Sequence, residues 1–454
     1  MKKTVPFPLA LASIVCTIVI MILCLAVLHT GPQLPLLIGC AIAAGFALWG
    51  GCSFRQIGSG VIRSVRQSLQ AICILLLIGA LIGVWIAAGV VPAMVYYGLQ
   101  LISPRLFLPG AMLVCAVLSM VLGSWGTAGT VGLAFMGMAH AMGIPLPLTA
   151  GAVISGSYVG DKLSPLADTT NLAAAVAQVD IFTAIRHIFK VSAPVFLICL
   201  GVYGAVGWHY GGTTTDSQQL TDICQTLSHA FHLSLLNLLP LLILLVCMLV
   251  RIPAIPSLAA GIVSGIIYGA VSQNTSVWAL VRCTVTGFIS QTHTDVVDEL
   301  LSAGGILSML YTISIILLAM SFGGIMEHTG QMEVLMRPLM KRTKGYASLM
   351  SATVATCICT NVMLPDQYIA IALPGQMYAG AFDTQDIPRK ELALCIGTGG
   401  ALTSALVPWN TCGTFMAGIL GVGTLSYLPF TFYNILMPIA VALYAVFRQK
   451  KTKQ

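Results

Sequence analysis

The segment from Gly160 to Asn171 (GDKLSPLADTTN) contains the residue types of an ion pathway. It holds two carboxylates, a lysine and several hydroxyl groups, and apolar sequence lies on both sides of it. A charged side chain at membrane depth costs about 2.5–3.5 kcal/mol even on the most lenient insertion scale. Since charges persist at that depth mainly where they have a function, the segment predicts a path for an ion or a proton.

Pro165 predicts a break in a helix within this segment, because proline lacks an N–H group and clashes with the preceding turn. A broken helix exposes carbonyl oxygens at one end and N–H groups at the other. Carbonyl, hydroxyl, amide and carboxylate oxygens are hard ligands that suit a small dehydrated cation such as Na⁺. The side chains that supply such oxygens around the break are Ser164, Asp168, Thr169, Thr170 and Asn171.

Asp168 is the charged ligand that we expect at this break. Because burial disfavours an ionised carboxylate, the same group would release H⁺ when Na⁺ arrives. The structural alternative is that Asp168 caps a helix beginning at Thr169, and the two roles are compatible. The adjacent Asp161 and Lys162 have two interpretations. They form an interfacial ion pair at a helix end, or Lys162 favours the ionised form of a nearby acid or keeps the empty site neutral.

Two further breaks are predicted in the second half of the chain, one after the apolar run 346–359 and one after Pro408. Asp366 is the acidic ligand expected there, and N-capping of a helix that starts at Gln367 is its structural alternative. The polar residues of these two breaks are Thr360, Asn361, Asp366, Asn410 and Thr411, with Pro365 beside them.

The first half has a corresponding break at 123–127 (GSWGT). Glycines at and after it are expected to serve close packing between helices; they are Gly126, Gly129 and Gly132.

Three ionisable residues outside the breaks are placed by their surroundings. His140 lies on an apolar stretch and is the one histidine expected within the membrane. His187 follows a cytoplasmic arginine and is expected at the surface, and Glu391 is expected in a polar connection.

The composition is that of a polytopic membrane protein. Of the 454 residues, 57% are hydrophobic and only 8% are charged, whereas charged residues make up about 25% of soluble proteins. Long apolar runs without strand alternation predict an all-α fold. The fourteen cysteines include no C-x-x-C pair, and most lie in apolar runs, where they act as small hydrophobic residues.

Apolar runs predict roughly ten to thirteen membrane passes, since about 20 apolar residues span a bilayer as a helix. The less regular apolar stretches 124–180 and 346–422 are rich in Gly, Pro, Ser and Thr and predict broken helices or re-entrant hairpins. The regular runs lie near 8–28, 33–50, 69–91, 105–122, 191–208, 232–250, 253–271, 304–325 and 427–447.

Charge placement predicts the topology. Lys and Arg cluster in short connections and at both ends, as is typical of cytoplasmic segments, so both termini are expected in the cytoplasm. The connection 211–231 has acidic residues but no Lys or Arg and is expected outside. It divides the chain into a first half, 1–210, and a second half, 232–454.

The two halves are expected to be inverted repeats. Both open with two apolar runs followed by an amphipathic stretch, 52–68 or 276–303, which the charges place on opposite sides. The segments Gly83–Gly89 and Ser164–Asn171 resemble Gly324–Gly330 and Ser404–Thr411. Inverted repeats with broken helices are typical of secondary transporters.

Four segments carry a resemblance to the NhaC-type Na⁺/H⁺ antiporter family: 123–132, 144–173, 366–378 and 403–416. The resemblance implies an inner-membrane antiporter of the ion-transporter superfamily, with inverted halves and re-entrant hairpins, that exchanges Na⁺ for H⁺. The chain also resembles relatives in the same family that exchange malate and lactate. The site residues that it implies are Asp161, Ser164, Asp168, Thr169, Thr170 and Asn171 in the first half and Asn361, Asp366, Asn410 and Thr411 in the second.

One departure from the family pattern lies in the second half. Leu364 and Pro365 precede the Asp-Gln-Tyr run, where family members often have glycine. Proline restricts the backbone and removes a donor, so this part of the site is expected to differ in shape and substrate.

We therefore expect a secondary antiporter of the cytoplasmic membrane in which Na⁺ and H⁺ compete for buried carboxylates, with Na⁺ at Asp168 and Asp366. The alternative is a Na⁺- and H⁺-coupled organic anion exchanger, because the positive ends of half-helices can hold a carboxylate and Lys162 would help. Motifs of nucleophilic, metal or nucleotide chemistry are absent, so no enzyme is expected. A channel is disfavoured because paired broken helices suit alternating access.

The expected partners are Na⁺, H⁺ and the lipid bilayer, and assembly as a homodimer is compatible with the sequence. No cofactor is expected. No nucleic-acid partner is expected either, since the net charge of +7 includes no basic patch interleaved with aromatic residues.

Overall fold

The computed structural model describes residues 5–28, 30–210, 217–340 and 345–452, and within these ranges it contains helices and no strand. The predicted all-α class is confirmed. Some of the predicted cytoplasmic charges and the start of the predicted outside connection lie outside the described residues; they are Lys2, Lys3, Lys341, Arg342, Lys344, Lys453 and residues 211–216.

The described residues of the first half contain nine α-helices. They are α1 (Phe7–Ile22), α2 (Gln33–Trp49), α3 (Phe54–Ala87), α4 (Val90–Leu101), α5 (Phe107–Thr127), α6 (Leu133–Ala141), α7 (Leu146–Leu163), α8 (Asp168–Ala177) and α9 (Ile181–Tyr210). A π-helical stretch, Ala128–Gly132, joins α5 to α6.

The described residues from Ser217 onward contain thirteen α-helices. They are α10 (Ser217–Ala230), α11 (Leu239–Leu249), α12 (Ala254–Ser272), α13 (Val277–Thr286), α14 (Asp295–Leu301), α15 (Leu310–His328), α16 (Gln331–Met340), α17 (Tyr346–Met363), α18 (Gln367–Thr384), α19 (Arg389–Ile396), α20 (Thr411–Leu420), α21 (Thr424–Tyr427) and α22 (Phe432–Thr452). The helix α10 occupies much of the segment 211–231 that was expected to be a loop.

Seven helical segments in the described residues are long and apolar enough to cross a membrane, or up to nine if each of two bent pairs counts as one span. Four shorter apolar helices are also present: Phe7–Ile22, Gln33–Trp49, Val90–Leu101 and Val277–Thr286. The chain is therefore a multi-pass membrane protein. The figure of ten to thirteen passes stays a prediction, because it requires some of these shorter helices to cross as well.

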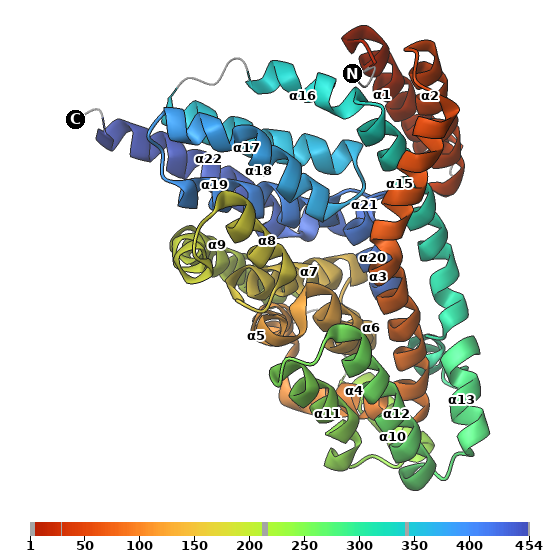
Figure 1. Cartoon of the computed structure of the whole chain (residues 1–454). Coiled ribbons are helices and arrows are strands. Elements are labelled where there is room, and N and C mark those ends of the chain that lie inside the picture. Colours follow the sequence, from red (N-terminus) through yellow and green to blue (C-terminus); the bar gives the residue numbers. More distant parts are fainter. Residues whose placement is uncertain (1–4, 29, 211–216, 341–344, 453–454) are drawn as a thin grey trace.

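Helix α3 is the longest element, and it forms a tall column along one side of the molecule (Figure 1). The sequence predicted an amphipathic stretch and a separate apolar run here, but the structure joins them in one helix of 34 residues, capped by the Ser53 side chain. At 1.5 Å per residue this helix is about 51 Å long, so it exceeds a hydrocarbon core of about 30 Å. Helices α12, α13 and α15 pack along it.

The interruptions recur in the same order in both halves. In the first half, Gly123 interrupts α5 with a left-handed φ of 69°, and residues 164–167 separate α7 from α8. In the second half, 364–366 separate α17 from α18, and 407–410 precede α20. The predicted inverted repeat of the two halves stays a prediction.

Helices α5 and α7 touch at their backbones. A Cβ atom added to Gly156 would lie 2.2 Å from the carbonyl oxygen of Met112, and one added to Gly160 would lie 2.1 Å from that of Ala116. Glycines four residues apart therefore let the two helices approach as closely as helices can. Because of this contact, the break in α5 and the C-terminal end of α7 lie next to each other.

The glycines predicted to serve packing have two kinds of neighbour. Added Cβ atoms on Gly129 and Gly132 would each lie 2.9 Å from a side chain of another helix, Ile78 and Val153 respectively. The nearest neighbour of Gly126 is instead Leu122, on its own helix.

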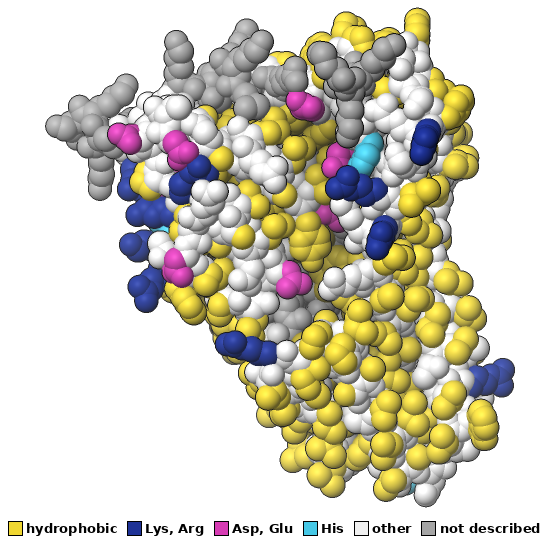
Figure 2. Space-filling view, in the orientation of Figure 1, with side chains coloured by type: hydrophobic (Ala, Val, Ile, Leu, Met, Phe, Trp, Pro, Cys, Tyr) yellow, Lys and Arg dark blue, Asp and Glu magenta, His cyan; other side chains and the backbone are white. Residues whose placement is uncertain are grey.

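The surface divides by residue type. Figure 2 shows that charged side chains gather over the upper part of the view, and that the lower part, around α10 to α13, is mostly hydrophobic. Large exposed apolar side chains, such as Leu242, Val246 and Val271 in the lower part, fit contact with lipid.

Candidate functional site

A cavity of about 440 Å³ lies where the helix breaks meet. Its walls come from α3, the break in α5, the α7–α8 break, the α11–α12 connection and the starts of α18 and α20. Of the ten predicted site residues, six line it: Asp161, Ser164, Asp168, Thr169, Asp366 and Thr411. Thr170, Asn171, Asn361 and Asn410 are not among its lining residues.

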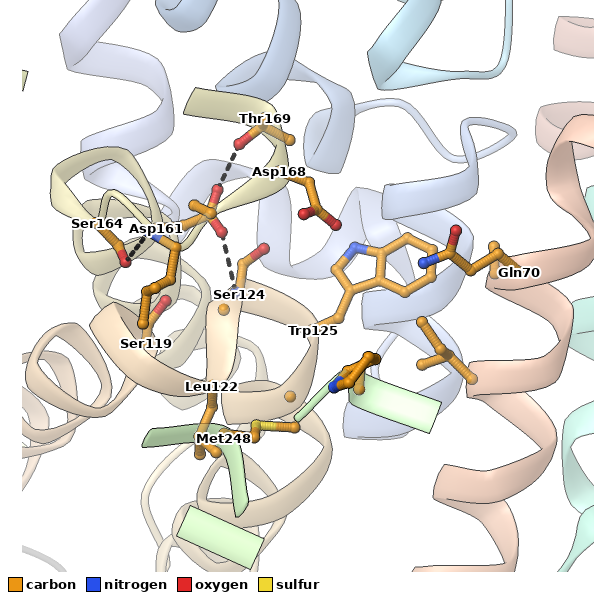
Figure 3. Close-up of a pocket in the computed structure, with 18 of the residues that line it drawn as sticks. Gln70, Ser119, Leu122, Ser124, Trp125, Asp161, Ser164, Asp168, Thr169 and Met248 are labelled. Carbon is orange, nitrogen blue, oxygen red and sulfur yellow. Dashed lines mark hydrogen bonds between the residues drawn. The ribbon is translucent and has the colours of Figure 1, made fainter. Parts of the chain in front are cut away.

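Asp161 and Lys162 form a buried ion pair at the C-terminal end of α7, and its depth in the membrane stays a prediction. Lys162 is 1% exposed, and its Nζ lies 3.8 Å from Asp161 Oδ2. Thr169 links the two residues, because its hydroxyl accepts a hydrogen bond from Lys162 (2.8 Å) and donates one to Asp161 (2.7 Å). The other carboxylate oxygen accepts the N–H of Ser124 in the α5 break, at 3.4 Å (Figure 3). The charge of Asp161 is therefore balanced within the protein.

Asp168 is the first residue of α8, and its side chain is exposed in the cavity. Figure 3 shows its carboxylate on the side of the cavity facing Trp125. The side chain makes no capping hydrogen bond, since the N-cap of α8 is Ala167. Within the described residues no hydrogen bond or ion pair involves this carboxylate, so both oxygens are available to a ligand.

Asp366 enters the cavity from the second half of the chain. It is 8% exposed and is the N-cap of α18, where Oδ1 accepts the N–H groups of Tyr368 (2.8 Å) and Ile369 (3.0 Å). Capping, the structural alternative, is therefore present. The second oxygen has no hydrogen bond recorded among the described residues. Asp366 combines the two roles, because one oxygen secures the helix and the other is left for a ligand.

Three helices begin at the wall of this cavity. Asp168 begins α8, Asp366 caps α18 and Thr411 begins α20, and all three residues line the cavity. A helix N-terminus carries about half a positive elementary charge. The electrostatic cost of two carboxylates inside a membrane protein is lowered by this arrangement.

The second-half amides hold the two breaks together and do not face the cavity. Asn361 donates to the carbonyl oxygens of Gly399 (3.3 Å) and Gly400 (2.6 Å). Asn410 donates to the side-chain oxygen of Asn361 (3.1 Å) and accepts the N–H of Cys412, so it caps α20. The N–H of Thr411 donates to the carbonyl oxygen of Pro365 (2.9 Å).

The remaining first-half residues close the α7–α8 break. The Ser164 hydroxyl donates to the Met120 carbonyl oxygen on α5 (2.5 Å), and that of Thr170 donates to the Asp161 carbonyl oxygen (3.0 Å). Asn171, which is exposed, donates to the carbonyl oxygens of Pro165 and Ala167 across the break. Thr170 and Asn171 thus stabilise the unwound backbone.

Several lining residues were not predicted as site residues. They are, among others, Gln67, Gln70, Trp125, Met248, Arg251, Gln367 and Tyr368. Two signals were present in the sequence: Trp125 lies within the predicted break at 123–127, and Tyr368 follows Asp366. The glutamines of α3 carried no such signal, because only the packing of α3 against the breaks brings them to the cavity.

His187 and Glu391 are buried, which corrects two predictions. His187 is 7% exposed and Glu391 is 0% exposed, and their side chains lie 2.8 Å apart. Arg448 and Tyr444 of α22 also donate to Glu391. His187 was expected at the surface and Glu391 in a polar connection, but the packing of α9, α19 and α22 encloses both side chains. This cluster is separate from the cavity.

His140 lies at the end of α6, with 27% of its side chain exposed, 3.7 Å from Glu299 of α14. It was expected within the membrane, and its exposed partner, with 78% of its side chain accessible, places it at a helix end that reaches the surface.

A helical membrane protein whose broken helices meet at a cavity lined by carboxylates has the architecture of a secondary transporter. The model of the Na⁺/H⁺ antiporter family matches residues 1–165 and 156–448. The chain belongs to this family, as the resemblance in the sequence predicted.

Relatives align along almost the whole chain. The Na⁺/H⁺ antiporter NhaC of Bacillus subtilis is 35% identical over 440 residues, which cover 96% of this chain and 97% of the relative. The malate-2H⁺/Na⁺-lactate antiporter of Bacillus subtilis is 32% identical, with 91% and 88% covered. The arginine/ornithine antiporter ArcD of Halobacterium salinarum is 35% identical, with 97% and 92% covered.

Proposed function

We propose that this protein is a secondary antiporter that exchanges Na⁺ for H⁺ across the cytoplasmic membrane, and that it is not an enzyme. The observation that carries the proposal is that Asp168 and Asp366, from the two halves of the chain, line one cavity. The similarity to relatives named as Na⁺/H⁺ antiporters supports it. Both termini are proposed to face the cytoplasm, from the distribution of Lys and Arg.

The chemistry follows from the two uncommitted carboxylates. Na⁺ prefers hard oxygen ligands, which here are the oxygens of Asp168, the free oxygen of Asp366 and the hydroxyl of Thr411. A proton that binds Asp168 removes its charge and one of its ligand sites. Na⁺ and H⁺ therefore compete for the same group, and competition at one site that faces each side in turn is sufficient for exchange.

Asp161 has a different role in this proposal from the one the sequence suggested. Its charge is balanced by Lys162, and its oxygens are engaged by Thr169 and Ser124. It holds the α5 break against the end of α7 and so positions Asp168, without being required as a ligand of Na⁺.

The test is Asp168→Asn in inverted membrane vesicles, with a pH-sensitive dye and salts added one at a time. We expect Na⁺-dependent H⁺ movement to fall by roughly 30- to 160-fold, because a contact to a charged group contributes about 2–3 kcal/mol. The amount of inserted protein, measured by immunoblot, should stay unchanged since this side chain bonds to no described residue. Full Na⁺-dependent H⁺ movement in the variant would show that Asp168 is not the exchange site.

A further inference from the structure

A buried group of ionisable side chains joins the two halves of the chain at a place separate from the cavity. His187 of α9 and Glu391 of α19 meet there with Tyr444 and Arg448 of α22, and we call these four residues the His187 cluster. The three helices pack against one another (Figure 1). None of the four side chains is among those that line the cavity, so the proposed exchange does not use them.

Glu391 lies at the centre of the His187 cluster. Its side chain is 0% exposed; one carboxylate oxygen lies 2.8 Å from His187 Nε2, and the other accepts hydrogen bonds from Arg448 and Tyr444. The Arg448 guanidinium also donates to the Tyr444 hydroxyl, at 2.6 Å. One buried carboxylate is therefore shared between a helix of the first half and a helix of the second.

The contact with Glu391 determines which nitrogen of His187 takes up a proton. Arg448 favours the ionised form of Glu391, and an ionised carboxylate only accepts hydrogen bonds, so Nε2 carries the hydrogen of this contact. In a neutral imidazole the other nitrogen, Nδ1, is then without a hydrogen and can bind one. Histidine changes its charge between about pH 5 and pH 8. A proton on Nδ1 turns a neutral hydrogen bond to Glu391 into a charge-assisted one, which is about twice as strong.

The charges of the cluster make its contacts depend on that proton. When His187 is neutral, the charges of Glu391 and Arg448 cancel, whereas two cations share one carboxylate when His187 is protonated. Arg448 is the cation that water can stabilise instead, because 38% of its side chain is exposed, while His187 is only 7% exposed. Protonation therefore moves the main contact of Glu391 from α22 to α9.

The titratable groups that face His187 are those of the cluster, from α19 and α22. The other elements that pack on α9 bring their charged or titratable groups to different places. On α8 the titratable residue is Asp168, at the cavity; α7 bonds to α9 at Tyr203, and Arg105, before α5, lies over Trp208. The remaining groups nearby are Tyr346 of α17 against Arg448, Cys395 of α19 near Glu391, and the exposed Arg186 and Lys190 of α9 itself.

The helices that Glu391 joins lead to the breaks at the cavity. α9 follows α8, the helix that Asp168 begins, after residues 178–180. α19 continues through residues 397–406 to the break at 407–410. A change in the contact between α9 and α19 can therefore reach a break in each half through continuous helical segments.

We propose that the His187 cluster is a second proton-binding site, at which a cytoplasmic proton slows exchange without being transported. This inference rests on the proposed function, because it concerns the rate of the same exchange. The protonated cluster ties α9 of the first half to α19 of the second, and alternating access requires the breaks to which these helices lead to rearrange. The cytoplasmic side follows from the predicted topology, in which Arg186 and Lys190 face the cytoplasm. An antiporter that brings H⁺ inward slows in this way when the cytoplasm becomes acidic.

The experiment measures the exchange of radiolabelled for unlabelled Na⁺ in inverted membrane vesicles, whose outer surface is the cytoplasmic face. The lumen is kept at about pH 8 and the bath is set to about pH 8 or about pH 6, on the two sides of the histidine range. Protons that compete with Na⁺ at Asp168 raise the Na⁺ concentration for half-maximal exchange, but saturating Na⁺ displaces them. A proton at the His187 cluster should instead lower the maximal rate. For the wild type we expect a maximal rate about five- to tenfold lower in the acidic bath, since a charged hydrogen bond replaces a neutral one.

Three variants test the cluster, with the amount of inserted protein measured by immunoblot. His187→Gln keeps a donor near Glu391 but cannot become charged, so its maximal rate should be the same in both baths. Arg448→Gln should act in the opposite sense. Without the guanidinium the buried carboxylate favours the charged histidine, and the rate in the alkaline bath should fall toward the wild-type rate in the acidic one. The matched control is His140→Gln, because His140 also pairs with a carboxylate, Glu299, but lies outside the cluster. It should slow in the acidic bath as the wild type does.

The outcomes separate this inference from the proposed exchange. If the wild type exchanges Na⁺ with a maximal rate that does not fall in the acidic bath, or if His187→Gln slows as much as the wild type, the inference is wrong and the exchange proposal stands. If His187→Gln does not reach the membrane, Arg448→Gln decides, and a response to pH equal to that of the wild type contradicts the inference. If the wild type shows no saturable Na⁺ exchange in either bath, the proposed function fails and this inference fails with it.

Discussion

The α7–α8 break and the two second-half breaks hold their polar groups in different ways. In the first half, an ion pair stabilises the break, because Lys162 balances the charge of Asp161 and Thr169 bonds to both. Asp168 is left without a partner among the described residues. In the second half, neutral amides stabilise the breaks, because Asn410 donates a hydrogen bond to Asn361 and so joins one break to the other. Asp366 has one oxygen engaged by backbone N–H groups. The cavity therefore has one carboxylate that is free and one that is half committed.

This difference suggests that the two halves have different roles in ion binding. A carboxylate without internal partners can lose or gain a proton and move freely, whereas Asp366 is held in one position because an oxygen of its side chain accepts two backbone N–H groups. We therefore expect the first half to respond to the bound ion and the second half to supply a fixed frame. The predictions below test this contrast, in order of decreasing effect.

Lys162→Met should have the largest effect on stability. It leaves the buried Asp161 carboxylate without its counter-charge, and breaking a buried pair costs about 3–5 kcal/mol. The amount of monodisperse protein recovered in detergent should fall sharply. Asp161→Asn combined with Lys162→Met should restore most of it, because the double variant leaves no unpaired charge. A single variant as stable as the wild type would show that the pair does not hold the first half together.

Asp366→Asn should impair exchange less than Asp168→Asn. Asparagine caps a helix about as well as aspartate, so α18 should stay in place, while one charged ligand is lost. We expect about a tenfold rise in the Na⁺ concentration for half-maximal H⁺ movement, equivalent to about 1.4 kcal/mol. Asp366→Ala is the paired variant, since it also removes the cap and should lower the unfolding temperature. An equal or greater loss in Asp366→Asn than in Asp168→Asn would reverse the contrast between the halves.

Asn410→Ala should destabilise the protein more than Asn171→Ala. The first change removes the cap of α20 and the donor to Asn361, all of it buried, at a cost of about 1–2 kcal/mol. The second removes donors from an exposed side chain, worth about 0.5–1 kcal/mol. Thermal unfolding of the two variants in one detergent measures the order. If Asn171→Ala unfolds at the lower temperature, amide hydrogen bonds stabilise the first-half break more than the second-half breaks.

Asp298 provides a reference carboxylate away from both sets of breaks. The N–H of Thr292 and then the hydroxyl of Ser290 lower its pKa to about 2, and the N–H of His293 donates to its other oxygen. A lowered pKa stabilises the folded loop above the ordinary carboxylate value and ceases to do so as the pH falls through about 2.

The amides of Thr292 and His293 should accordingly keep constant protection from hydrogen exchange, after correction for intrinsic rates, between about pH 5 and pH 8. A pH dependence of transport in that range would then arise at groups outside this loop. Protection that declines within this range would mean that another group controls the loop.

The class of protein, the helix breaks and the main carboxylates follow from the sequence because each has a local cause. Pro165, Pro365 and Gly123 interrupt helices through their own backbone restrictions or freedom, and a carboxylate in apolar sequence stands out whatever its neighbours. Such signals need no knowledge of which helices touch.

The partners of the charged groups do not follow from the sequence, because they depend on how helices cross. Lys162 reaches Thr169 only because the chain turns back at residues 164–167, and His187 meets Glu391 across 204 positions of sequence. Asn361 and Asn410 were predicted as site residues, but their side-chain amides donate hydrogen bonds to backbone carbonyl oxygens.

The backbone contact between α5 and α7 has a consequence for how this chain can vary. Any side chain at Gly156 or Gly160 would drive a carbon into the carbonyl oxygen of Met112 or Ala116, and the shift would reach Ser124 and Asp161 at the far ends of those helices. In a library of random single changes, these two positions should accept no replacement at all. The exposed face of α5, which includes Leu113 and Val117, should tolerate many.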